Sequence, residues 1–127
     1  MRGKLFHNMI VQKTKAVFTE HTWQVQTECC IKKAGTNYYF DLLAIKGQYK
    51  VACEVETTRR HAIDNALKAS IVDIPLWFIV PTRNIKNQIA DRLKKLRMKP
   101  GNEPIKILLL DQLEQELLDY LDKHKIT

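Results

Sequence analysis

Two short apolar segments in the second half of the chain limit the possible folds most strongly. Residues 74–80 and 105–110 are almost continuously apolar, and Pro81 ends the first of them. Runs of this length without alternation are typical of strands that are buried on both faces, as in a parallel sheet covered by helices. Residues 83–97 between them repeat apolar side chains at helical spacing. A strand, a helix and a strand in this order predict a parallel crossover within one sheet.

The remaining segments extend this unit to a complete domain. Apolar side chains spaced three and four residues apart predict helices, and alternating or branched segments predict strands. The predicted elements are, in chain order, helix 4–20, strands 23–31, 38–46 and 49–56, helix 59–72, strand 74–80, helix 83–97, strand 105–110 and helix 112–124. We therefore expect an α/β fold of order αβββαβαβα, with a mixed β-sheet and helices on both faces, in a single domain over residues 1–127.

The charge of the chain favours a polyanionic partner. Lys and Arg number 21 against 14 Asp and Glu, a net charge of +7, and five of the acids lie in the last 17 residues. The body before them is therefore more basic than the total. DNA is the partner that such a charge favours, through counterion release, although solvated lysine faces give the same composition.

Other features restrict the location and the cofactors. No apolar run approaches the roughly 20 residues that span a membrane, and the N-terminus lacks the pattern of a signal peptide. The three cysteines have no zinc-binding spacing, so we expect free thiols in a reducing compartment, the cytoplasm. With four glycines in the chain and no glycine-rich phosphate loop, no nucleotide cofactor is expected.

Three carboxylates are placed to converge. Asp41 lies within an aromatic and branched strand, and Glu54 and Glu56 lie two residues apart, which puts both on one face of the next strand. A hairpin at Gly47 and Gln48 brings Asp41 beside them. Mutually repelling carboxylates favour a hard divalent cation, Mg²⁺ or Mn²⁺. The alternative is that Asp41 faces solvent on an edge strand and the two glutamates form a solvated face.

This arrangement resembles a known superfamily. A helix, a hairpin with Asp on its first strand and E-x-K or a variant on its second, and then a helix and a strand resemble the PD-(D/E)xK nucleases, the restriction-endonuclease-like superfamily. The likeness covers nearly the whole chain in element order, but its motif is short. Glu54-Val55-Glu56-Thr57, followed by Asn65 and Lys68, is also similar to a V-E-V-E-T…N-x-x-K signature of nuclease-like domains from plasmids, phages and mobile elements.

The resemblance implies a metal-dependent endonuclease that hydrolyses DNA phosphodiester bonds. Asp41 and Glu54 would be metal ligands, and Glu28, on the strand next to the hairpin, is the best candidate for a third. The usual catalytic lysine would fall at position 56, where this chain has Glu56. We expect Glu56 to assist and Lys68 to replace the missing lysine, unless Lys68 is one more surface lysine.

A nuclease site of this kind cuts one strand, so a homodimer is plausible for cutting duplex DNA. Because the lysine is missing, a second function stays open: a catalytically inactive nuclease-like module that binds DNA or a partner protein. The candidates for contacts with the DNA backbone are Arg59, Arg60, Lys86, Lys94 and Lys95.

A few side chains are weaker candidates. His7 and His61 are possible general bases or phosphate contacts, but an isolated histidine is more often a surface or packed residue. Tyr38, Tyr39 and Trp77 are expected in the core rather than stacked on bases.

Overall fold

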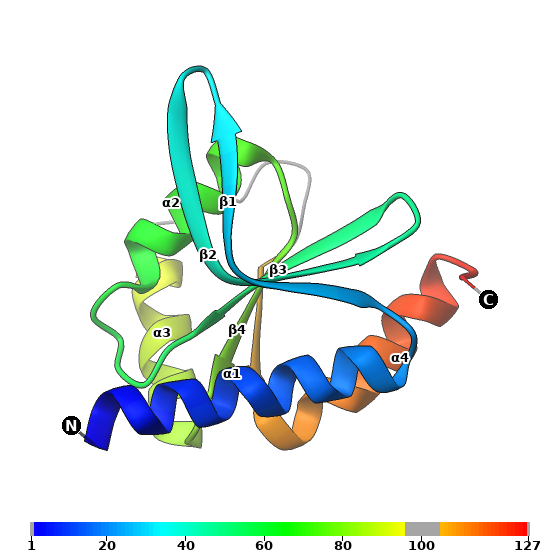
Figure 1. Cartoon of the computed structure of the whole chain (residues 1–127). Coiled ribbons are helices and arrows are strands. Elements are labelled where there is room, and N and C mark those ends of the chain that lie inside the picture. The colour runs from blue at the N-terminus through cyan, green and yellow to red at the C-terminus, as the bar shows by residue number, and fades with distance from the viewer. Residues whose placement is uncertain (1, 96–104, 127) are drawn as a thin grey trace.

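The helices and strands of the computed structural model, which describes residues 2–95 and 105–126, lie close to their predicted positions (Figure 1). The elements are α1 (Arg2–Glu20), β1 (Gln24–Lys33), β2 (Thr36–Lys46), β3 (Tyr49–Val55), α2 (Ala62–Val72), β4 (Leu76–Val80), α3 (Arg83–Lys95), β5 (Ile105–Leu109), a 3₁₀ turn (Leu110–Gln112) and α4 (Leu113–Lys123). The predicted end of the third helix, residues 96–97, lies outside the described residues.

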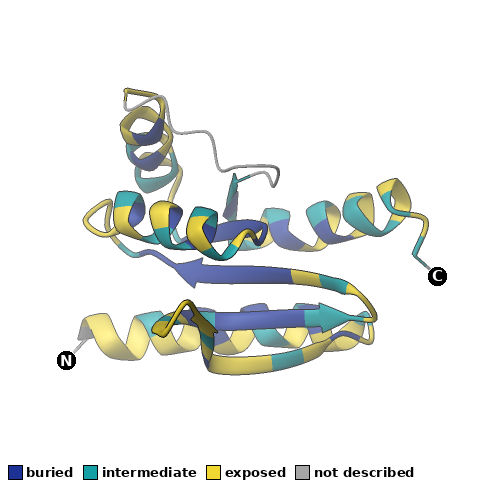
Figure 2. Cartoon of the chain, turned by 90° about the horizontal axis from the view of Figure 1, so that it is seen from above, coloured by how far each residue is buried: buried dark blue, intermediate teal, exposed yellow. Residues whose placement is uncertain are grey.

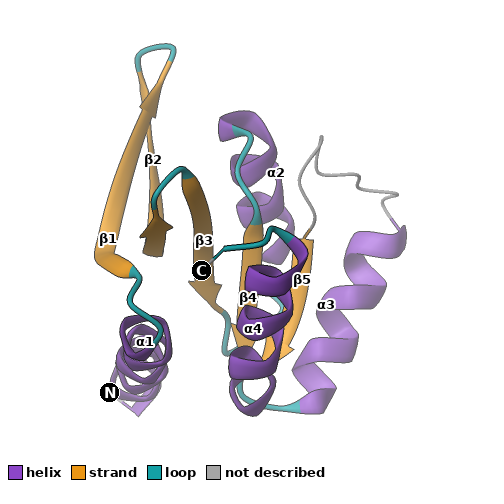
Figure 3. Cartoon of the chain, turned by 90° about the vertical axis from the view of Figure 1, so that its right-hand side faces the viewer, coloured by secondary structure: helices purple, strands orange, loops and turns teal. Residues whose placement is uncertain are grey.

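The strands form a mixed sheet in the order β1-β2-β3-β4-β5 (Figure 3). β1, β2 and β3 pair antiparallel, whereas β3–β4 and β4–β5 pair parallel. All five residues of β4 are buried, as expected for a parallel strand covered on both faces. The predicted α/β fold with a mixed sheet is therefore confirmed.

Helices cover both faces of the sheet. On one face, Phe18 of α1 and Leu113 of α4 pack with Trp77 in one buried cluster. On the other, Ala66 of α2 and Ile89 of α3 belong to a second cluster, which also includes other β4 side chains. Figure 2 shows the buried central strands between helices whose outer surfaces are exposed. The carboxyl end of β3 is buried between these layers and leads into the turn that precedes α2.

The second helix starts later than its pattern predicts. The sequence predicted a helix from residue 59, directly after two threonines that could cap it, but α2 begins at Ala62 and its N-cap position, His61, makes no side-chain cap. Instead, Thr58 Oγ1 accepts the backbone N–H of Arg60 at 3.2 Å. A hydroxyl that bonds two residues ahead stabilises a turn in place of the first helical turn. Arg60 therefore lies in the turn that precedes α2.

Two further expectations need correction. Tyr39 is 58% exposed and is not a core residue, whereas Trp77 is fully buried as expected. Leu110, predicted as the end of the last strand, opens the 3₁₀ turn. There, Gln112 Oε1 accepts the N–H of Leu109 at 3.0 Å, which turns the chain before α4.

The three cysteines are free thiols, Cys29 and Cys53 buried and Cys30 exposed. Among the described residues, no helix has both the length and the apolar character required to cross a membrane.

Candidate active site

Asp41 and Glu54 face each other across neighbouring strands. Leu42 pairs with Cys53 in the β2–β3 ladder, so the next position of the same register places Asp41 opposite Glu54. Asp41 Oδ2 accepts the backbone N–H of Val55 at 2.8 Å, and His7 Nε2 of α1 lies 3.1 Å from the same oxygen. The carboxylate thus takes the place of a strand carbonyl at the end of the ladder, which holds it beside β3.

Glu54 is buried and in contact with a lysine from α2. Its exposed fraction is 6%, and Lys68 Nζ donates a hydrogen bond to Glu54 Oε1 at 2.9 Å. The same ammonium donates to the carbonyl oxygen of Tyr39 and lies 4.5 Å from the centroid of the Phe40 ring. Lys68 therefore reaches Glu54, one of the two alternatives that the sequence left open, and is held there by three contacts.

Glu56 is buried as well, with an exposed fraction of 7%. Asn65 Nδ2 donates a hydrogen bond to Glu56 Oε1. The alternative in which Glu54 and Glu56 form a solvated face is therefore wrong. Asp41 does not lie on an edge strand either, because β2 has a neighbour on each side.

Burial changes the protonation of both glutamates. It raises the pKa of Glu54 to about 8, with a further rise from the charge of Asp41 and an opposing effect of Lys68. Burial also raises the pKa of Glu56 to about 7, which the hydrogen bond from Asn65 opposes. At neutral pH the site therefore holds protons that a bound cation would displace.

Two cavities adjoin the Asp41–Glu54 pair, and both of these carboxylates line each of them. The first, of about 400 Å³, is lined by His7, Asp41, Glu54, Val55, Glu56, Thr57, Thr58, Arg60, His61 and Asn65. The second, of about 500 Å³, is lined by Glu28, Tyr39, Phe40, Asp41, Glu54 and Lys68. The carboxylates are thus accessible from two sides, one bordered by Arg60 and the other by Lys68.

Sequence reasoning missed the contacts that organise this site. His7 was only a weak candidate, and Asn65 entered only through a motif. Asn65 and Lys68 are three residues apart, a spacing that places both on one side of a helix, and this signal was available. The contact of His7 with Asp41 joins residues 34 positions apart and had no local signal.

Glu28 has a left-handed backbone in the middle of β1. Its φ is +51°, a region that non-glycine residues rarely adopt. Thr27 pairs with Leu42 and Cys29 pairs with Phe40, so Glu28 lies opposite Asp41 at a point where the ladder is interrupted. Such a conformation costs about 1–3 kcal/mol and is concentrated at functional sites. Glu28 also lines the second cavity.

We expect Glu28→Gly to stabilise the fold by about 0.5–1 kcal/mol, because glycine adopts positive φ without strain while its greater freedom in the unfolded chain offsets part of the gain. Urea unfolding measures this free energy. Thr27→Gly is the matched control: it should destabilise the protein by about 1 kcal/mol, since Thr27 has ordinary strand pairing. Loss of stability in Glu28→Gly would show that its conformation carries no strain.

The donor set suits a hard divalent cation through two carboxylates. Within residues 2–95 and 105–126, no group of three or more His, Cys, Asp and Glu side chains is arranged to hold a metal ion. Asp41 and Glu54 nevertheless offer adjacent oxygen donors, and burial together with the charge of Asp41 disfavours the charged form of Glu54. Glu28 borders the same cavity from β1. Asp41 and Glu54 are therefore the residues that fit Mg²⁺ or Mn²⁺, with Glu28 as a further candidate.

The basic residues predicted to contact the DNA backbone lie at different places in the structure. Arg60 lines the first carboxylate cavity. Arg59 and Lys95 line a different cavity, which lies between helix α3 and the turn before α2. Lys86 Nζ donates to Gln112 Oε1 at 2.9 Å, next to the 3₁₀ turn. Lys94 is exposed on α3. The five predicted contacts with the DNA backbone therefore lie at different places, and their binding of DNA stays a prediction.

Comparisons with known proteins support the fold alone. No family model and no curated protein matches the sequence. Among solved structures, the chain is similar to one titled as the crystal structure of a protein of unknown function, AF1548, with a TM-score of 0.57 and 14% identity over 91% of this chain. The match spans 66% of that longer protein. At this identity the likeness concerns the arrangement of helices and strands and carries no activity.

Proposed function

We propose that this protein is a metal-dependent deoxyribonuclease that hydrolyses DNA phosphodiester bonds. The observation that supports it is the convergence of Asp41, Glu54 and Lys68 from three elements, with Lys68 Nζ 2.9 Å from Glu54. A basic group beside two carboxylates is what phosphodiester hydrolysis requires: oxygen donors for a cation and a positive charge for the transition state. The motif resemblance to the PD-(D/E)xK nucleases agrees with it.

Each residue has a distinct role in this proposal. Asp41 and Glu54 would hold Mg²⁺ or Mn²⁺, with Glu28 as a further ligand. When bound, the cation polarises the phosphate and lowers the pKa of water. Glu56, which lines the first cavity, would accept a proton from the attacking water. Lys68 would stabilise the negative charge that develops on the phosphate.

The cellular location, the type of source and the oligomeric state are also part of the proposal. The free thiols favour a cytoplasmic protein, and the motif favours a mobile element, plasmid or phage. One site cuts one strand, so cutting of duplex DNA would need a homodimer. The second candidate is a catalytically inactive module that binds DNA or a protein. It is favoured by one observation, Glu56 in the position where the superfamily usually carries its lysine.

The test is cleavage of labelled single-stranded, nicked, flapped and four-way DNA with Mg²⁺, with Mn²⁺ or with EDTA. We expect cutting that requires metal and that falls about 100-fold or more in Asp41→Asn, because the variant removes a charged ligand. The asparagine oxygen can still accept the N–H of Val55, so the fold should persist. Asp122→Asn, an exposed position on α4, is the matched control.

Two results would reject the nuclease. Cutting by Asp41→Asn at the wild-type rate would locate the activity elsewhere or in a contaminant. DNA binding without any cutting, unaffected by metal and by Asp41→Asn, would favour the inactive module.

A further inference from the structure

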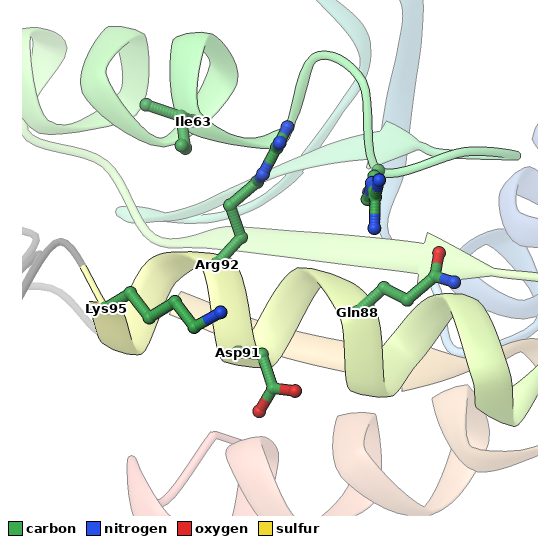
Figure 4. Close-up of a pocket in the computed structure, with 6 residues that line it drawn as sticks. Ile63, Gln88, Asp91, Arg92 and Lys95 are labelled. Atoms are coloured by element: carbon green, nitrogen blue, oxygen red, sulfur yellow. The ribbon is translucent and has the colours of Figure 1, made fainter.

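A basic groove lies next to the carboxylate site, between the turn that precedes α2 and helix α3 (Figure 4). It has a volume of about 470 Å³, within the range of pockets that hold small ligands. Its lining residues, which define the basic groove, are Arg59, Ile63, Gln88, Asp91, Arg92 and Lys95.

Among residues 2–95 and 105–126, no side chain forms an ion pair with the cations of the basic groove. Within the described parts of the chain, Arg59, Arg92 and Lys95 form no ion pair, and neither does Asp91. Arg92 and Lys95 are three residues apart on α3, so their like charges repel each other on one helix face. In Figure 4 the Arg92 side chain extends from α3 toward the turn before α2, whereas the Asp91 carboxylate points away from it. A bound anion would relieve this repulsion.

The basic groove and the carboxylate site are joined by neighbouring residues. Arg60 lines the first carboxylate cavity and Arg59 lines the basic groove. The two hollows are therefore lined by consecutive residues of the turn that precedes α2. A DNA strand held at the carboxylates could reach the basic groove past these two arginines.

We infer that the basic groove binds the backbone of a single-stranded DNA segment that adjoins the scissile bond, an inference that rests on the proposed function. Arginine and lysine bind the phosphates, and guanidinium groups do so with two parallel hydrogen bonds. Ile63 gives the groove an apolar wall for a sugar or an unstacked base, which a duplex keeps inside its stack. The volume of about 470 Å³ suits a nucleotide unit of one strand.

The test is fluorescence anisotropy of a labelled single-stranded oligonucleotide and of a duplex, in EDTA, at several salt concentrations. In Arg92→Gln/Lys95→Gln we expect about tenfold weaker binding of the single strand near 0.1 M salt. The slope of log affinity against log salt should also fall by about 1.4, because two cation–phosphate contacts are lost. Binding of the duplex should change less. Asp91→Asn should act in the opposite direction and tighten binding of the single strand several-fold.

The matched control is Lys13→Gln/Lys123→Gln. Both lysines are exposed on α1 and α4, across the sheet from the basic groove, and this double variant changes the net charge by the same amount. It should leave the affinity and the salt slope close to those of the wild type. Circular dichroism of all variants verifies that they fold.

Several outcomes would overturn the inference. One is an Arg92→Gln/Lys95→Gln affinity and salt slope equal to those of the control. Another is equal weakening for the single strand and the duplex. A third is that Arg92→Gln/Lys95→Gln no longer binds inorganic phosphate or a mononucleotide but binds DNA as the wild type does. The groove would then be a site for small anions.

Failure of the proposed function gives a different result. If wild-type protein binds the single strand through the basic groove but cuts none of the DNA panel with Mg²⁺ or Mn²⁺, the nuclease is rejected and the groove stands. If it cuts DNA and the groove variant still binds with wild-type affinity and salt slope, the groove is rejected and the nuclease stands.

Discussion

Glu54→Gln should lower the rate of metal-dependent DNA cleavage by about 10³-fold, the largest effect that we expect from a single substitution. Glutamine keeps the size of the side chain and an oxygen that can accept the hydrogen bond from Lys68. It removes the negative charge that Glu54 would carry when it holds the cation beside Lys68. Loss of a stabilising charge at the transition state lowers rates by about 10²–10³-fold, and Glu54 serves both the metal and Lys68. Single-turnover cleavage at saturating protein measures the effect on the chemical step.

The matched control is Glu114→Gln, at an exposed position of α4 on the opposite face of the sheet. It should cut DNA at the wild-type rate. DNA binding of Glu54→Gln in EDTA should remain within a few-fold of wild type, since this residue is proposed to act on metal and chemistry. A Glu54→Gln protein that is folded and retains most of its cleavage rate would rule out the site.

Without metal, the folded protein should lose stability as the pH rises from about 4.5 to about 8. The pKa of Glu54 is raised from 4.5 to about 8 by burial, then by Asp41, against the opposing effect of Lys68. Over this interval the folded state binds more protons than the unfolded state, so the free energy of unfolding falls with pH. The contribution is fully present below 4.5 and is lost as the pH passes through about 8. Its size is on the order of a few kcal/mol.

Urea unfolding in EDTA between pH 5 and pH 8.5 measures this dependence. Glu54→Gln cannot ionise at this position, so its free energy of unfolding should fall less with pH than that of wild type. Asp122→Asn, which changes an exposed carboxylate on α4 with no ion pair among the described residues, should follow wild type. Mg²⁺ added at pH 8.5 should raise the free energy of unfolding of the wild-type protein but not that of Glu54→Gln. A ligand that binds only the folded state stabilises the folded state. Parallel curves for wild type and Glu54→Gln would show that the carboxyl has an ordinary pKa.

The agreement between predicted and observed elements has a local cause. Residues 76–80 form a strand buried on both faces, and their continuous apolar pattern encodes that burial directly. The start of α2 was misplaced because Thr58 has two competing uses, as a helix cap or as a turn acceptor, and local sequence does not choose between them. Tyr39 was misplaced for a related reason. An aromatic residue in a strand does not by itself indicate whether its face of the sheet is covered or exposed to solvent.

For the candidate site, the strand spacing of Glu54 and Glu56 and the hairpin at Gly47 were sufficient to predict that three carboxylates lie close together. Their protonation was not predictable. The pKa of Glu54 near 8 depends on its removal from water by the helices packed over β3 and on the charge of Asp41 on the next strand. Neither the degree of burial nor a distance between strands is a property of the local sequence.

The sequence by itself determined the order and approximate positions of the helices and strands, that β4 and β5 are parallel, and that Asp41 and Glu54 meet across one hairpin. These follow from side-chain periodicity and short-range chain geometry. Only the tertiary structure decided that Lys68 contacts Glu54, that His7 contacts Asp41, that Glu28 is strained opposite Asp41, and that Arg92 and Lys95 share a groove with Arg59. Those contacts join distant segments, and they depend on how the helices pack on the two faces of the sheet.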